Sequence, residues 1–134
     1  MNPKHIFYEK FNETCDEFCK DIIASFPNIE AFKHIKVGLN IIKNLDMKSP
    51  QRVFHNHIYI TQYKDMILMR NEDFFLTKDD FNLRHSSVEK KEYWSDFINS
   101  IRNIWRNLPG TDKDIIWKYF HILLILSEKC SVDH

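Results

Sequence analysis

Glycine and proline are almost missing from this chain, since 2 glycines and 4 prolines occur among its 134 residues. Folds built from β-strands need many tight turns, and tight turns depend on these two residue types. Their scarcity therefore predicts long helices joined by short links, which is an all-α fold. It also leaves the chain without a glycine-rich phosphate-binding loop.

The first predicted helix begins at Asn2, a favourable N-cap, followed by Pro3, which suits the first turn of a helix. Pro27 ends it, because the residue before a proline avoids the helical conformation. Between these points, apolar side chains recur at spacings of three and four and predict one buried stripe. The stripe consists of Phe7, Phe11, Cys15, Phe18, Cys19, Ile22, Ile23 and Phe26.

A second helix is predicted from Asn28, another favourable N-cap, to about Leu45. Its buried stripe consists of Phe32, Ile35, Leu39 and Ile42. Val37 and Ile41 make this pattern less regular. Gly38 lies inside the helix and costs roughly 1 kcal/mol relative to alanine.

A third helix is predicted from the pair Ser49-Pro50, an N-cap and a first-turn residue. Its inward face would hold Val53, Phe54, His57 and Ile58. The segment 60–69 is ambiguous between a short strand and a helix, and its spacing favours the helix. Residues 71–88 are predicted to be irregular, with short helical turns, one of them starting near 77–80, and a mobile loop at 83–87.

The spacing of Ser86 and Glu89 matches a capping box and predicts a helix that ends at Pro109-Gly110. The last helix is predicted over residues 112–128, and apolar side chains cover it nearly all round. Because helices of that kind are normally buried, we expect it in the middle of the bundle. The length of the chain suits a single domain over residues 1–134. The sequence thus predicts a compact bundle of about five main helices with short extra turns between residues 60 and 85.

The formal net charge is zero, with 19 basic and 19 acidic residues, so the totals give no sign of a nucleic-acid-binding protein. The longest apolar run, residues 122–126, is far shorter than the roughly twenty residues that span a bilayer. Three cysteines and an N-terminus without the apolar core of a signal sequence indicate reduced thiols. We therefore expect a cytoplasmic protein.

Candidate catalytic and metal-binding residues are few. Cys15 and Cys19 share a helix face and could ligate a metal, but a structural zinc site needs four ligands, so two core thiols are the simpler interpretation. His55 and His57 would point in different directions on a helix. None of the sequence signatures of hydrolases or metalloenzymes is present. We therefore expect no cofactor and no enzymatic activity, with a metal-binding or enzymatic role of these cysteines and histidines as an alternative.

Aromatic residues make up 14% of the chain, including three tryptophans: Trp94, Trp105 and Trp117. Such residues usually form the core, but tryptophan is rarely buried completely and is enriched at the centres of protein interfaces. The leading hypothesis is therefore a non-enzymatic protein-interaction or structural module, which uses exposed tryptophans to bind another protein or a second copy of itself.

A basic face is the alternative. Lys33, Lys36 and Lys43 are spaced so that they share one side of the second helix, and Lys48 and Arg52 follow. The segment 33–52 could therefore contact nucleic acid despite the zero net charge. The simpler interpretation is the solvated surface of that helix.

Three segments occur together in a characteristic order: the aromatic stripe from Phe11 to Phe26, the run 71–76 (NEDFFL) and the run 115–120 (IIWKYF). In this order the chain resembles small uncharacterised helical proteins encoded by nucleocytoplasmic large DNA viruses. The resemblance covers most of the chain and rests on apolar anchors. It implies a viral protein that acts inside an infected cell or is packaged in a particle, and it assigns no activity and no catalytic residue.

Overall fold

The computed structural model describes residues 3–76 and 88–131, and it describes only the backbone for residue 3 and residues 88–95. These residues form helices and no strands, which confirms the all-α prediction. The helices are α1 (Pro3–Ser25), α2 (Glu30–Leu45), α3 (Ser49–Phe54), the π-helical turn η1 (His55–Tyr59), α4 (Tyr63–Leu68), α5 (Asp73–Leu76), α6 (Val88–Trp105) and α7 (Gly110–Ser131). The predicted N-caps at Asn2 and Ser86, the turn near 77–80 and the loop at 83–87 lie outside the described residues.

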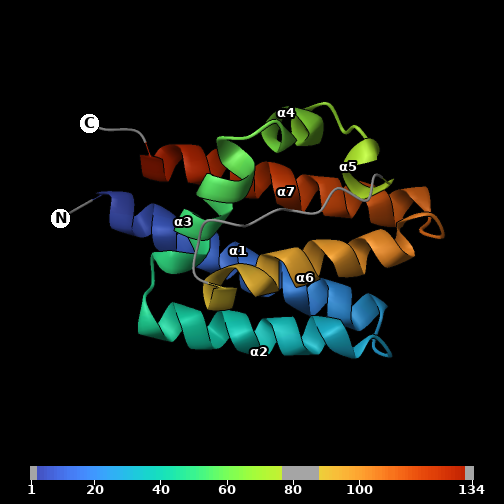
Figure 1. Ribbon diagram of the computed structural model, residues 1–134, viewed down its shortest axis with the longest axis horizontal. Coiled ribbons are helices and arrows are strands. Elements are labelled where there is room, and N and C mark those ends of the chain that lie inside the picture. Colours follow the sequence, from blue (N-terminus) through green and yellow to red (C-terminus); the bar gives the residue numbers. More distant parts are fainter. Residues whose placement is uncertain (1–2, 77–87, 132–134) are drawn as a thin grey trace.

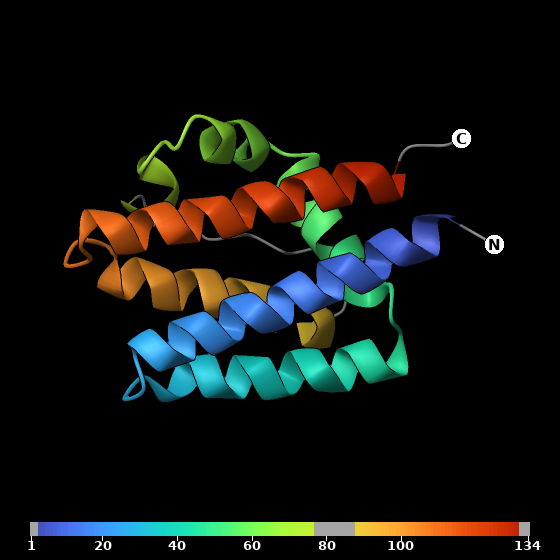
Figure 2. The same cartoon turned by 180° about the vertical axis from the view of Figure 1, so that it is seen from behind.

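The long helices run along the long axis of the molecule, with α2 at one edge and α4 and α5 at the other (Figure 1). Seen from behind, α1 and α7 lie side by side in front of α6 (Figure 2). The start of α1 and the end of α7 lie at the same end of the bundle, where the Lys129 ammonium sits 5.2 Å from the centre of the Phe7 ring. Helices from the two ends of the chain therefore form one common face.

Helix α1 follows its predicted stripe closely. Phe11, Phe18 and Ile22 are buried on one side, together with both cysteines of the helix. The helix ends at Ser25, two residues before Pro27, as the restriction on the residue before proline requires. Helix α2 starts two residues later than Asn28, with Ile29 as its N-cap and no side-chain capping bond. Backbone bonds through the turn replace the predicted asparagine cap.

The segment 60–69 forms a turn followed by α4, so the helical interpretation of its spacing is confirmed. Arg70 ends α4 in a left-handed conformation with φ of 50°. Its N–H donates to the carbonyl of Ile67, and the N–H of Asn71 donates to the carbonyl of Met66. This pair of bonds is the Schellman ending of a helix, which normally places glycine where Arg70 stands.

The short helix α5 is stabilised by contacts with the core, because it is too short to be stable by itself. Phe74 and Phe75 are buried, and Phe75 stacks on Trp105 with ring centres 4.2 Å apart. Arg102 of α6 donates from Nε and Nη2 to the carbonyl of Phe74, at 3.2 and 2.9 Å. Side chains of α6 therefore fix a four-residue helix that could not persist alone.

Helix α7 is not enclosed by the bundle. Its inner side is buried, with Phe120 and Leu123 at its middle, but Ile115, Ile122 and Ile125 on its outer side are 46%, 44% and 52% exposed. The prediction that the last helix is the central one is therefore wrong for this outer face. The physical reason is that α1, α3, η1 and α4 cover only part of its circumference.

Candidate interaction surface

Two of the three tryptophans predicted to form an interaction surface are buried. Trp105 and Trp117 are 0% and 3% exposed, and their rings meet edge to face with centres 5.3 Å apart. Phe75 covers Trp105 from one side, and the Lys113 ammonium lies 5.2 Å from the centre of its ring. The side chain of Trp94 lies outside the described part of the structure. Trp105 and Trp117 are core residues because α5 packs over them. The local spacing of apolar residues in the sequence does not predict this packing.

The predicted basic residues do follow one flank of α2, but acidic side chains accompany them. Lys33 pairs with Glu30 at 3.5 Å, and Lys36 lies 3.9 Å from Asp16 of α1. A hydrogen bond from Lys20, aided by the charges of Lys36 and Lys43, lowers the pKa of Asp16. Arg52 is exposed on α3. The positive charge of this flank is therefore partly neutralised at short range, which weakens the case for a phosphate-binding face.

The cysteines are buried free thiols. Burial raises the pKa of all three thiols, to about 12 for Cys19 and to about 11 for Cys130. All three are therefore held in the unreactive thiol form. No group of three or more histidine, cysteine or carboxylate side chains comes together in the described residues. Cys15 and Cys19 therefore belong to the core.

The histidine pair leads to a polar contact that the sequence did not reveal. His55 stacks on Tyr59, with ring centres 4.8 Å apart, and its Nδ1 lies 3.3 Å from Oγ of Ser127. Gln51 donates from Nε2 to the same oxygen at 2.8 Å. A serine and a histidine in contact resemble part of a catalytic triad, but Ser127 is completely buried. This cluster ties α3 and η1 to α7 and offers no access to a substrate.

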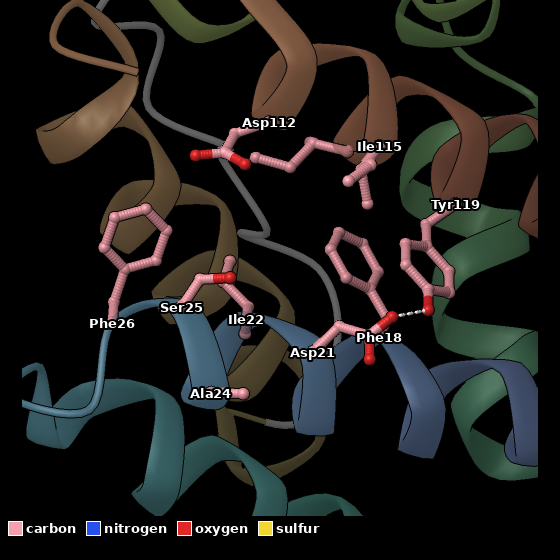
Figure 3. A pocket seen from close by; sticks show the side chains of 10 residues that line it. Phe18, Asp21, Ile22, Ala24, Ser25, Phe26, Asp112, Ile115 and Tyr119 are labelled. Atoms are coloured by element: carbon pink, nitrogen blue, oxygen red, sulfur yellow. Dashed lines mark hydrogen bonds between the residues drawn. The ribbon is translucent and has the colours of Figure 1, made fainter. Parts of the chain in front are cut away.

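A groove lies between the C-terminal half of α1 and the N-terminal half of α7 and has a cavity volume of about 250 Å³. Figure 3 shows Ile22 and Phe18 rising from α1 and Ile115 descending from α7 toward the same space. Phe26 lies at one end, and Tyr119 closes the other end by stacking on Phe18, with ring centres 4.5 Å apart. We call this feature the α1/α7 groove.

The rim of the α1/α7 groove is acidic. Asp21 of α1 and Asp112 of α7 approach it from opposite sides (Figure 3). The hydroxyl of Tyr119 donates a hydrogen bond to Asp21. Burial, this hydrogen bond and the charges of Asp21 and Glu17 raise the pKa of Tyr119 well above its ordinary value. The rim therefore combines two carboxyl side chains with a tyrosine hydroxyl that keeps its proton.

The outer face of α7 continues the groove as an apolar strip. Ile115 lines the groove and is followed at spacings of seven and three by Ile122 and Ile125. Lys118 and Lys129 are exposed on the same side of the helix. We call Ile115, Ile122 and Ile125 the α7 strip. Because Ile115 also lines the α1/α7 groove, this convex apolar row continues directly from the concave site.

A second apolar strip lies on α2, which forms one edge of the molecule (Figure 1). Val37, Ile41 and Leu45 are 59%, 56% and 82% exposed and follow one another one helical turn apart. These residues disturbed the periodicity because they lie on the outer face of α2. We call them the α2 strip. It is a single convex row, and none of its residues lines the α1/α7 groove.

Comparisons with protein-family models, with curated proteins and with solved structures found no match to this chain. The resemblance to proteins of large DNA viruses therefore stays a prediction. Among the described residues, no helix is both long and apolar enough to cross a membrane.

Proposed function

We propose that this protein is a non-enzymatic interaction module that binds another protein through the α1/α7 groove and the α7 strip. The observation that carries the proposal is the continuity of these two features, since Ile115 belongs to both. Apolar surface left in water costs about 25 cal/mol per Å², and contiguous apolar patches beside polar rims are typical of binding sites. A concave site next to a helical strip suits a protein partner that has an anchoring side chain.

The chemistry of the remaining side chains supports a binding role over a catalytic one. Ser127 lies in contact with His55 but is completely buried, and the thiols have raised pKa values in the core. A nucleophile needs access to its substrate and a lowered pKa or an adjacent base. Ser127 lacks access to a substrate, and the thiols lack both access and a lowered pKa.

The proposal extends to a reducing compartment such as the cytoplasm. Its support is chemical: three free thiols in one small chain are typical of proteins that do not meet an oxidising environment. A viral origin stays a prediction from the order of the apolar segments.

Paired charge substitutions test which face binds. Ile122→Glu with Ile125→Glu places two carboxylates on the α7 strip, and Val37→Glu with Ile41→Glu makes the same change on the α2 strip. Because all four side chains are exposed, both double variants are expected to fold, and circular dichroism checks this. Tagged wild type and both variants are used to capture proteins from the cells in which the protein naturally occurs, and bound proteins are quantified by mass spectrometry.

We expect a protein that the wild type and the α2 variant retain equally and that the α7 variant loses by tenfold or more. A partner retained by the α7 variant and lost by the α2 variant would contradict the assignment. So would light-scattering data in which the wild type is a dimer that only the α2 substitutions dissociate, because the exposed surface would then serve self-association. Capture of no protein above the background of an untagged control would also count against the proposal.

A further inference from the structure

We infer that the α1/α7 groove receives one apolar side chain of a helical segment in a partner protein, and that this side chain is flanked by a basic residue. This inference rests on the proposed function and adds the chemistry of the partner. It combines three properties of the same site: an apolar floor, an acidic rim and a helical strip that continues from it. Each property independently restricts which partners can bind.

The charge of the rim selects a basic residue next to the anchoring side chain, whereas the exposed Lys118 and Lys129 beside the α7 strip disfavour a partner helix that is basic along its whole length. Asp21 and Asp112 approach the groove from opposite helices, and Glu17 is close enough to act on Tyr119. Within the part of the chain that the structure describes, the ion pairs involve other carboxylates, such as Asp16, Glu72 and Asp114. An arginine or lysine beside the anchoring side chain would therefore meet carboxylates that have no basic partner of their own in the described residues. Complementary charge of this kind mainly raises the association rate and fixes orientation.

The neutral hydroxyl of Tyr119 strengthens this arrangement. Its O–H donates a hydrogen bond to Asp21, and burial together with this hydrogen bond raises the pKa of Tyr119. The hydrogen bond holds the Asp21 carboxylate at the mouth of the groove, and Tyr119 itself rests on Phe18. The acidic rim is therefore positioned before a partner arrives, which lowers the entropy cost of binding.

The dimensions favour a helix over a small molecule. Ligand pockets usually enclose about 300–1,000 Å³. The groove has about 250 Å³ and shares Ile115 with the α7 strip, so it suits a single side chain. At a rise of about 1.5 Å per residue, the α7 strip extends about 15 Å from Ile115 to Ile125, which matches roughly three turns of a partner helix. Helices that bind in this way present apolar anchors at spacings of three, four and seven residues.

Two synthetic peptides test the inference. Each is an amphipathic helix of about 12 residues with leucine and one phenylalanine on its apolar face, and the polar residues that flank the phenylalanine are lysine in one peptide and glutamate in the other. Binding to the full chain is measured by fluorescence anisotropy at low and at physiological salt. We expect saturable binding of the lysine peptide and at least tenfold weaker binding of the glutamate peptide.

Three variants locate the site. Ala24 is exposed and lines the groove, so Ala24→Phe fills the space without disturbing the core, and it should weaken binding at least tenfold. Asp21→Asn with Asp112→Asn should weaken it about three- to tenfold and reduce its salt dependence, because both carboxylates lie on the rim. The matched control, Asp65→Asn with Asp96→Asn, removes two exposed carboxylates from α4 and α6 and should leave the affinity unchanged. Thermal unfolding of each variant confirms that it folds.

The possible failures are distinguishable. If Ala24→Phe abolishes binding of both peptides while the Asp21 and Asp112 substitutions have no effect, the groove binds partners without selecting a flanking basic residue, and the inference is overturned while the proposed function stands. If neither peptide binds at millimolar concentration, or if the control pair weakens binding as much as the rim pair, the inference is also overturned. If the captured partner of the wild type is retained fully by Ala24→Phe and by the α7 variant, the proposed function fails as well.

Discussion

Buried polar side chains show how single residues connect distant parts of this chain. Gln51 and Ser127 are separated by 76 positions, and their hydrogen bond of 2.8 Å lies inside the core. Asn12 of α1 also connects distant segments, because its Nδ2 donates to the carbonyl of Met47 in the link between α2 and α3. A buried polar group that loses its partner retains the full cost of leaving water. These bonds therefore favour one specific packing of the helices.

Ser127→Ala is expected to lower the free energy of unfolding by about 1–3 kcal/mol, because the buried amide of Gln51 loses its acceptor at 2.8 Å and keeps only the more distant backbone carbonyl of residue 127, at 3.4 Å. The matched control is Ser131→Ala, one turn later on α7, where the hydroxyl is exposed and bonds only to carbonyls of its own helix. This control should change stability by less than about 0.5 kcal/mol. Urea unfolding measures both. Equal losses in the two variants would show that the contact between Gln51 and Ser127 contributes nothing specific.

His55 gives the stability a dependence on pH. Burial lowers the pKa of His55, so the folded protein favours the neutral ring. The unfolded chain, with a histidine pKa of about 6.5, takes up the proton first as the pH falls. The contribution of His55 is therefore complete above this value and is lost as the pH falls through the lower pKa of the folded state.

The melting temperature of the wild type should accordingly fall more between pH 8 and pH 5 than that of His55→Gln. His34→Gln, which changes an exposed histidine on α2, is the matched control and should follow the wild type. If His55→Gln shows the same pH dependence as the wild type, the burial of His55 does not influence stability in this range.

At the scale of helices, local spacing determined most of what could be predicted. The stripe of α1 and the stop at Pro27 follow from the sequence alone, since both depend on residues close together in the chain. The outer faces of α2 and α7 could not be read in the same way. Ile41 and Ile122 are as apolar as buried residues, and only the position of the neighbouring helices leaves them exposed.

Gly38→Ala is expected to stabilise the protein by about 0.5–1 kcal/mol, because alanine restricts the unfolded chain and favours the helix. A methyl group at this position of α2 would meet no atom within 4 Å, so the folded state accepts it without strain. Gly110→Ala, at the first residue of α7, should give a smaller gain because it is not in a helix interior. Thermal and urea unfolding measure both. A loss of stability in Gly38→Ala would contradict the open surroundings of this residue.

At the scale of the whole molecule, the candidate site arises from the pairing of the two ends of the chain. Asp21 and Tyr119 are 98 positions apart, and nothing in the sequence around either of them indicates that they meet. The sequence predicted an interaction surface of tryptophans, but Trp105 and Trp117 are buried in the core. The α1/α7 groove and the α7 strip replace that surface with isoleucines and carboxylates, which have no distinctive sequence signature.

Site-specific crosslinking tests the assignment of this surface most directly. A photoreactive amino acid is placed at position 122 on α7, at 41 on α2 or at 99 on α6, three exposed positions on different helices, and the protein is illuminated in the cells in which it naturally occurs. We predict one partner adduct that forms from position 122, does not form from 41 or 99, and disappears when Ala24→Phe fills the groove. An adduct that forms from position 41 or 99 instead, or that persists in the Ala24→Phe protein, would contradict the account.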